Sequence, residues 1–530
     1  MVMMVRVIMV NTLSLPFLSP PLHPQPQQTN KAMKNSSESQ DLLHRPPPES
    51  TTLPTGALSF LLQPLEWIRM LCRELNTSFV LGVMLVYGLS QGFTGSFFRV
   101  VTDFYWKDVQ KVQPSAVQMY IGFYYIPWIL KPVWGILTDM FPVRGYRRRP
   151  YFILAGVLGA STALTISMEG KLSIPVALLC LVGMAAGVAI ADVTIDACIA
   201  KNSIEKPNLA PDLQSLCSFV SSVGALIGYS SSGILVHLFG SQGALGLMAI
   251  PPVFLVLLGF AIFERKTNHP RENRAVGEKV REAVFGMGRT IRCPEVWKPS
   301  LFMFLSIALS LSTHEGQFYW YTDPKAGPAF SQGFVGIIYA IGAIASIIGV
   351  LIYHKLLKNH PFRSLIFYSQ LLYSASGMLD LMFILRWNLK LGIPDYIFVI
   401  LEECVSRVIS RIRWMPMIVL STRLCPAGIE GTFFALLMCI DSLGSLGSKT
   451  GGGVLLNLFH VTRTDFRNLW LVVFIRNLLR LVTVTLVFLV PYTTQLDALL
   501  PSKLLNGNNG SDVENLKLVS MKQVEVEETL

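Results

Sequence analysis

The chain has 530 residues, of which 52% are hydrophobic and 15% are charged, whereas a soluble domain carries about 25% charged residues. The apolar residues recur in blocks of about 18 or more, as in membrane-spanning helices, so the sequence predicts an all-α membrane protein. The net charge of +11 resides mainly in connecting loops and offers no soluble basic face for nucleic acid. The eight cysteines lack paired C-x-x-C spacing, so we expect no disulfide framework, no metal site and no cofactor.

In chain order, residues 1–76 are predicted to be a disordered N-terminal extension, because their proline-rich stretches are too polar to pack. Twelve transmembrane helices are then expected, in two sets of six. They lie near residues 77–98, 114–137, 150–168, 173–200, 213–238 and 243–263, and then near 299–321, 332–353, 364–385, 395–420, 428–458 and 468–490. This division predicts an N-terminal six-helix half at 77–263, a cytosolic connector at 264–298, a C-terminal six-helix half at 299–490 and a disordered tail at 491–530.

The distribution of basic residues predicts which loops are cytosolic. The loops on one side of the predicted spans, including the connector, carry 19 lysines and arginines, and the loops on the other side carry 9. Short loops rich in basic residues stay on the cytosolic side of a membrane. Both termini and the connector are therefore expected in the cytosol.

Six spans, a basic cytosolic connector and six more spans are the plan of the major facilitator superfamily, which is built from two parallel halves. The loop after the second span supports this assignment. Gly135-x-x-x-Asp139 and the basic run at 144–150 resemble the superfamily's loop signature, with extra residues between them. An aspartate and arginines can pair across the cytosolic mouth in one of two rocking states, although the arginines can equally serve only to hold the loop inside. The predicted gating residues are Asp139, Arg147, Arg148 and Arg149.

Two carboxylates near the end of the fourth predicted span favour a protein interior or a wet cavity. Asp192 and Asp196 are four residues apart and therefore share one helix face. An ionised aspartate facing lipid costs roughly 3 kcal/mol even on the lenient insertion scale. The alternative is that the helix has already ended and both acids are solvated, since Lys201 and Asn202 follow.

Three segments carry a more specific resemblance: GYRRRPYFILAG (Gly145–Gly156), ADVTIDACIA (Ala191–Ala200) and LCPAGIEG (Leu424–Gly431). Together with the twelve-span plan, over roughly residues 75 to 490, they resemble the folate-biopterin transporter family of plants, cyanobacteria and trypanosomatids. The resemblance implies a plant-type, facilitator-fold carrier of folates or pterins.

Under the superfamily plan, the first, fourth, seventh and tenth spans line a central cavity. These four spans also hold the polar and charged residues that would be most costly to expose to lipid. The tenth is the most polar, with Glu402, Glu403, Arg407, Arg411 and Arg413. Its i, i+4, i+8 spacing predicts that Glu403 pairs with Arg407 and that Arg411 has no partner on its own helix. The candidate substrate-binding residues are Gln91, Asp192, Asp196, Glu315, Glu403, Arg407 and Arg411.

A folate-like molecule would suit acids on the fourth span that face arginines on the tenth. A carboxylate accepts hydrogen bonds from the pteridine edge, and a guanidinium matches the carboxylates of the glutamate tail. The alternative is a gate in which these charges only neutralise one another across the two halves. Lys131 and Asp380 are expected to be structural partners within the bundle. Arg476 and Arg480 are expected either to pair within the bundle or to extend along the helix toward the membrane surface.

The sequence therefore predicts a secondary transporter that moves folate or pterin compounds by alternating access, with a small-molecule substrate and the lipid bilayer as partners. Titratable acids in the cavity are compatible with protons as a further partner. The alternative is a carrier of another solute such as a sugar, which would not require the arginines of the tenth span. An enzyme is not expected, because no catalytic triad, metal set or phosphate loop is present. The plasma membrane, the vacuolar membrane and the plastid envelope all stay open.

Overall fold

The structure is a computed structural model that describes residues 57–492, except for 169, 171, 207–208, 265, 267–280, 282–290, 358–359 and 425–429. Most of the predicted N-terminal extension, connector and C-terminal tail therefore lie outside the described residues. The chain forms two compact units, Met1–Thr77 and Ser78–Leu530. In the first unit, Ala57–Glu74 forms helix α2, inside the stretch for which the sequence predicts disorder. Its leucines and isoleucine recur at helical spacing, a pattern that the proline-rich residues before it obscure.

The N-terminal half follows the predicted order of spans. The first span continues to Val109, eleven residues beyond its predicted end at residue 98, as one helix with two π-helical segments. Its parts are α3 (Thr77–Val83), η1 (Met84–Phe93), α4 (Thr94–Phe104) and η2 (Tyr105–Val109). The other helices of this half are α5 (Pro114–Phe123), α6 (Ile126–Ile129), α7 (Lys131–Met140), α8 (Arg149–Met168), α9 (Ile174–Glu205), α10 (Ala210–Leu247) and α11 (Ile250–Ala261).

The C-terminal half also consists mainly of long helices, and one of its predicted spans is interrupted. The predicted seventh span consists of two helices that Leu309–Thr313 separates. The helices of this half are α13 (Pro294–Ala308), α14 (His314–Tyr321), α15 (Gln332–Ile352), η4 (Tyr353–Leu357), α16 (Phe362–Ile384), α17 (Trp387–Lys390), α18 (Asp395–Arg423), α19 (Glu430–Leu458), α20 (Leu469–Thr485) and η5 (Leu486–Leu489).

Six helical stretches of the described residues are long and apolar enough to cross a membrane. The longest, Asp212–Ala261, has 50 residues and would extend about 75 Å, enough for two crossings of a hydrocarbon core about 30 Å thick. It breaks at Gly240, whose φ of +68° suits glycine and which falls between the fifth and sixth predicted spans. The protein is therefore a multi-pass membrane protein, and the count of twelve spans stays a prediction.

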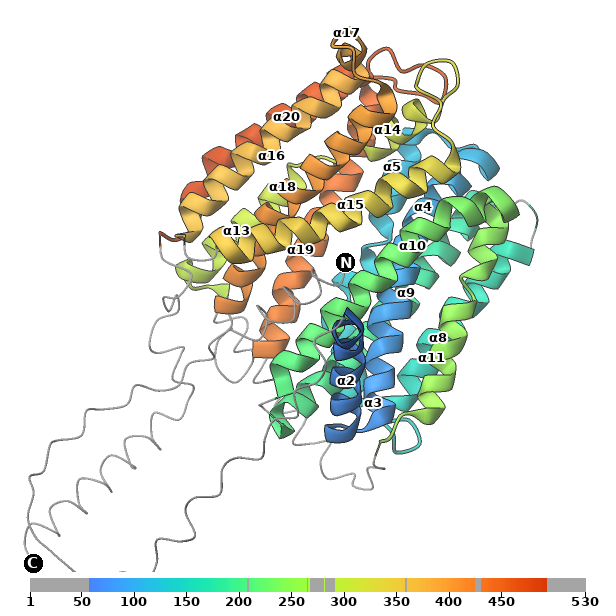
Figure 1. Ribbon diagram of the computed structural model, residues 1–530, viewed down its shortest axis with the longest axis vertical. Helices are drawn as coiled ribbons and strands as arrows, with labels where there is room; N and C mark the ends of the chain where they lie inside the picture. Colours follow the sequence, from blue (N-terminus) through green and yellow to red (C-terminus); the bar gives the residue numbers. More distant parts are fainter. Residues whose placement is uncertain are drawn as a thin grey trace, which may run out of the picture. The chain divides into compact units, whose positions relative to one another are not determined.

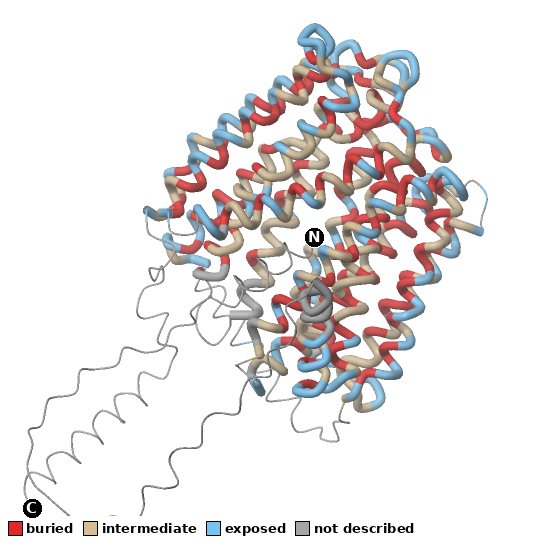
Figure 2. The backbone as a smooth tube through the Cα atoms, in the orientation of Figure 1, coloured by how far each residue is buried: buried red, intermediate tan, exposed pale blue. Residues whose placement is uncertain are grey.

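Within the second unit, the halves meet along two seams, where α10 packs against α15 and α5 packs against α19 (Figure 1). Glycines allow this close approach. A Cβ on Gly233 would lie 2.3 Å from the carbonyl oxygen of Gln332, and one on Gly453 would lie 2.6 Å from that of Ser115. Figure 2 shows exposed positions along the outward faces of the helices, where large apolar residues such as Leu179, 71% exposed, suit contact with lipid.

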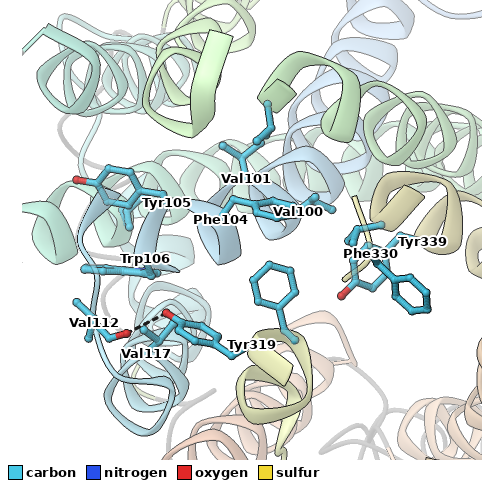
Figure 3. Packing of buried hydrophobic residues seen from close by; sticks show 14 of the residues in the cluster. Val100, Val101, Phe104, Tyr105, Trp106, Val112, Val117, Tyr319, Phe330 and Tyr339 are labelled. Carbon is cyan, nitrogen blue, oxygen red and sulfur yellow. Dashed lines mark hydrogen bonds between the residues drawn. The ribbon is translucent and has the colours of Figure 1, made fainter. Parts of the chain in front are cut away.

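The largest apolar core lies where the halves meet, at the helix ends opposite the loop 141–148, which we call the outer ends. Figure 3 shows Tyr319 of α14 reaching toward α5 and donating its hydroxyl hydrogen to the carbonyl oxygen of Val112 at 3.0 Å. Nearby, the indole N–H of Trp106 donates to the hydroxyl of Tyr124 at 2.7 Å. The Phe104 and Phe318 rings meet edge to face across the halves, with centroids 5.0 Å apart. The outer ends are therefore closed by an aromatic core.

Candidate substrate cavity

Two adjoining cavities, of about 260 and 340 Å³, lie between the halves and share Arg99 and His314 in their walls. The first cavity has a mostly apolar and aromatic wall from the N-terminal half, including Phe98, Tyr124 and Trp128. The second cavity lies mainly against the C-terminal half. Ligand pockets of carriers and enzymes typically combine such an apolar wall with a few placed polar groups.

The second cavity has an unusually basic wall for a membrane interior. Five arginines and three carboxyl groups line it, so an excess of two positive charges remains even if every acid is ionised. They are Arg99, Arg407, Arg413, Arg476 and Arg480, with Asp380, Glu402 and Glu403. Charges in a membrane interior are costly and usually mark a functional site.

Two of these arginines are neutralised locally. The Nε of Arg407 donates to Glu403 at 2.6 Å, which confirms the pairing predicted from their i, i+4 spacing. Arg476 donates to Asp380 at 2.5 Å, as expected of residues that pair within the bundle. Both ion pairs hold their guanidinium groups at the cavity wall and neutralise the positive charge of these groups.

Arg413 and Arg480 lie together on one aromatic ring. Their guanidinium carbons lie 4.4 and 4.2 Å from the ring centroid of Tyr373. Arg413 donates to the amide oxygen of Gln370 at 3.1 Å, and the Nε of Arg480 is buried without an acceptor among the described residues. In that part of the chain, neither forms an ion pair.

A second group of titratable residues joins the halves at the outer side of the cavity. Asp103 of α4 and Glu315 of α14 are 1% and 0% exposed. The Nε2 of His314 lies 3.0 Å from the carboxylate of Asp103 and 3.2 Å from the Tyr339 hydroxyl. Both carboxyl oxygens of Glu315 are buried with no hydrogen-bond donor among the described residues. Its backbone N–H donates to the Gln118 side chain at 3.0 Å.

These three side chains could also reach one metal ion by distance, because their ligand atoms lie within 4.8 Å of one another. Two cations, Arg99 and Lys449, share the same cavity wall. Their positive charges oppose a divalent cation, so we assign no metal to the group.

The acids of α9 have partners in their own half rather than in the tenth span. Asp192 is buried and pairs with Lys131, which also confirms the prediction that Lys131 has a partner within the bundle. It also accepts a hydrogen bond from Gln91, and Asp196 accepts one from Tyr87. Neither acid lines either cavity, so the expected approach to the arginines of the tenth span is absent from this conformation.

The remaining candidates are divided between the cavity and the surface. Glu403 and Arg407 line the basic cavity, and Glu315 follows the wall residue His314 in the chain but does not itself line either cavity. Arg411, in contrast, is exposed and lies 5.3 Å from the ring centroid of Trp414, outside both cavities. The i, i+4 spacing correctly predicted the Glu403–Arg407 pair. It did not predict that Arg411, one turn further along α18, lies outside both cavities.

The loop that carries the predicted gating residues is bound by hydrogen bonds to Glu264, which lies just after the end of α11. The backbone N–H groups of Arg147, Arg148 and Arg149 all donate to the carboxylate of Glu264, at 2.6 to 3.1 Å. This is an anion held at a helix N-terminus, since α8 begins at Arg149. The Arg149 side chain also donates to the carbonyl oxygen of Ile262 at 2.8 Å. The side chain of Asp139, in α7, lies outside the described residues.

The wall residues Tyr373 and Tyr339 were not singled out by the sequence. Both are aromatic residues in apolar helices, and their chemistry comes from arginines that approach from other helices. Span 12 did hold a usable signal, because Arg476 and Arg480 are two arginines four residues apart in an apolar helix.

Comparison with known proteins places these features in a family. The model of the BT1 family matches residues 91–500. The chain is 61% identical to "Probable folate-biopterin transporter 6" of Arabidopsis thaliana, over 85% of this chain and 90% of the relative. It is 32% identical to "Folate-biopterin transporter" of Synechocystis sp., over 79% and 81% of the two chains.

Solved structures agree on the fold. The nucleoside transporter NupG superposes with a TM-score of 0.57 at 13% identity, over 78% of this chain and 98% of that one. A D-xylose-proton symporter superposes with a TM-score of 0.53 at 16% identity, over 78% and 97%. At these identities the likeness establishes only the fold, which is the major facilitator fold that the sequence predicts. The chain belongs to the BT1 family, as a plant-type member of the folate-biopterin transporters.

Proposed function

We propose that this protein carries folates and unconjugated pterins across a membrane by alternating access. The names of its relatives in a plant and a cyanobacterium support this substrate class. The single observation in the structure that carries the proposal is the pairing of an aromatic cavity with a basic one. A folate presents a flat pteridine ring at one end and two tail carboxylates at the other, which matches these two walls.

The alternative, a neutral sugar, would leave the excess positive charge of the basic cavity without a counter-charge. Unpaired buried charge is costly, so a site evolved for a sugar has no reason to keep it. The discriminating experiment is uptake of labelled folate, biopterin and sucrose into vesicles that contain the purified protein. Saturable uptake of folate and biopterin is expected, without uptake of sucrose. Sucrose uptake without folate uptake would contradict the proposal.

Proton coupling is a further part of the proposal, and the group of Asp103, Glu315 and His314 supports it. The carboxyl oxygens of Asp103 and Glu315 lie within 4.8 Å of each other in a buried site, where both acids cannot be ionised cheaply, so the pair can carry a proton. Arg99 faces the group from α4 and Lys449 faces it from α19, yet among the described residues neither forms an ion pair with these acids.

The group spans both halves: Asp103 belongs to the N-terminal half, and His314 and Glu315 belong to the C-terminal half. Tyr339 of α15 and Tyr124, the residue that follows α5, also face it. Separation of the halves at the outer ends would admit water between the two acids and let the shared proton exchange with that side. Closure would then trap the proton together with the substrate.

The test of this coupling compares driven uptake with exchange. An inward proton gradient should accelerate folate uptake by the native protein. Glu315→Gln mimics the protonated acid, so it should abolish the acceleration and preserve exchange of labelled for unlabelled folate. Acceleration of the variant equal to that of the native protein would contradict the assignment.

The acids of α9 are proposed to act on the cytosolic side of the cavity. There Asp192, Asp196 and Gln91 form a polar cluster with Lys131 and Tyr87. We expect the substrate to pass this cluster when it leaves. Asp196→Asn should therefore slow net uptake more than it weakens folate binding, and equal losses in both would contradict an exit role.

A further inference from the structure

Two arginines of the basic cavity, Arg413 and Arg480, form no ion pair within the described part of the chain. Arg407 and Arg476 have carboxylates within hydrogen-bond distance, whereas Arg413 and Arg480 do not. The third acid of the cavity, Glu402, lies beside Asp380 rather than beside either of these arginines. Three arginines of the cavity, Arg99, Arg413 and Arg480, are thus left without an ion pair among the described residues, and two of them, Arg413 and Arg480, lie on the ring of Tyr373.

The surroundings of these arginines position them as a pair. Tyr373 of α16 holds both guanidinium groups over its ring, and Gln370, one helical turn earlier, accepts a hydrogen bond from Arg413. On α16, Gly377 leaves room for Arg480: a Cβ there would lie 2.8 Å from its Nη1. Stacking against an aromatic face leaves the guanidinium edges, which carry the N–H donors, available to a ligand.

The unsatisfied donor supports a missing anionic partner. The Nε of Arg480 is buried and has no acceptor among the described residues, although buried donors are nearly always paired. A carboxylate is the group whose two oxygens match the fork of a guanidinium. Two guanidinium groups without ion pairs, both within 4.4 Å of one ring centroid at the wall of a cavity, therefore fit a dicarboxylate better than a single carboxylate.

We propose that Arg413, Arg480 and Tyr373 form a dicarboxylate subsite that holds the glutamate tail of folates and takes no part in holding unconjugated pterins. This inference rests on the proposed function for its choice of substrate. It assigns selectivity within that substrate class to three residues of the C-terminal half. The pteridine ring would then lie toward the aromatic cavity of the N-terminal half, where both classes of substrate bind alike.

The experiment measures binding by the purified protein of three ligands: folate, biopterin and p-aminobenzoyl-glutamate, which is the tail without the pteridine. Loss of a charge-assisted pair of hydrogen bonds predicts that Arg480→Gln weakens folate and p-aminobenzoyl-glutamate roughly 10- to 100-fold. Biopterin binding should not change, and this ligand serves as the control for folding. Lys390→Gln removes one positive charge from the exposed helix α17, outside both cavities, and should leave all three affinities unchanged.

The remaining outcomes separate this inference from the proposed function. If Arg480→Gln and Arg413→Gln weaken folate and biopterin equally, or weaken neither, the dicarboxylate subsite is refuted while the function stands. If the native protein binds p-aminobenzoyl-glutamate through Arg480 but binds no pterin, the subsite stands and the proposed function fails. Should Arg480→Gln not fold, Arg480→Lys keeps the charge but not the fork, and it must still weaken folate selectively.

Discussion

Gly233, at the seam between α10 and α15, allows a test of alternating access in which the substitution adds only one methyl group. In Gly233→Ala the new Cβ would lie 2.3 Å from the carbonyl oxygen of Gln332, a distance that real Cβ atoms do not adopt. These two residues belong to different halves and lie near the outer ends. The collision therefore exists when the outer side is closed and disappears when the halves separate there.

The size of the effect follows from the cost of overpacking. Inserting a methyl group into a close contact costs about 1–3 kcal/mol. If that cost applies to only one of two conformations, the equilibrium between them shifts roughly 5- to 150-fold. We therefore expect Gly233→Ala to favour the conformation that is open at the outer side.

The matched control is Gly224→Ala, which introduces an even closer contact inside one half. Its Cβ would lie 2.0 Å from the carbonyl oxygen of Gly88, and both residues belong to the N-terminal half. A half that moves as a rigid body carries this collision through both conformations. This variant should lower the melting temperature without shifting the conformational equilibrium.

The assay is labelling of Ser115→Cys, at a buried position of α5 near the outer end, by a membrane-impermeant thiol reagent. The chain without this substitution gives the background from the native cysteines. Labelling from the outer side should accelerate in the Gly233→Ala background and stay unchanged in the Gly224→Ala background. Equal labelling rates in both backgrounds would refute the view that the seam separates during transport.

Three further predictions concern the side that the sequence predicts to be cytosolic. Replacing Arg147 and Arg148 with Gln should reduce transport per molecule more than abundance in the membrane, because the other basic residues of the loops predicted to be cytosolic still hold the topology. A collapse of abundance with normal transport per molecule would refute gating by this loop. Glu264→Ala leaves three backbone N–H groups without their anion and should lower the free energy of unfolding by about 1–3 kcal/mol, measured by thermal denaturation; an unchanged melting temperature would contradict this. Asp192→Ala should lower the free energy of unfolding by about 1–3 kcal/mol because it removes the ion-pair partner of the half-buried Lys131, whereas exchanging the two residues should restore much of the abundance; failure of the exchange would indicate a role beyond charge pairing.

The sequence predicted well those features that depend on local periodicity. The order of the helices and the break near Gly240 follow from the apolar blocks, and the Glu403–Arg407 pair follows from i, i+4 spacing. The helix at Ala57–Glu74 was missed because composition over a long stretch outweighed a short periodic segment.

Contacts between distant helices could not be predicted in the same way. Residues 174–190 of α9 are apolar on every face of the helix, so the sequence pattern did not show which face lies inside. It therefore could not predict that Asp192 pairs with Lys131 of α7. Asp103 and His314 are 211 residues apart, and their contact depends on which end of the protein is closed. Tyr373 acquires its importance only because arginines from α18 and α20 converge on it.

Reciprocal competition between folate and biopterin tests most directly the central claim that one two-part cavity carries both substrates. Initial uptake rates of each labelled compound would be measured in vesicles over a range of concentrations of the other. A shared pteridine site predicts purely competitive inhibition, with the inhibition constant of biopterin against folate uptake equal to the KM of biopterin for its own uptake. Non-competitive inhibition, or uptake of one compound that the other does not affect, would contradict the account.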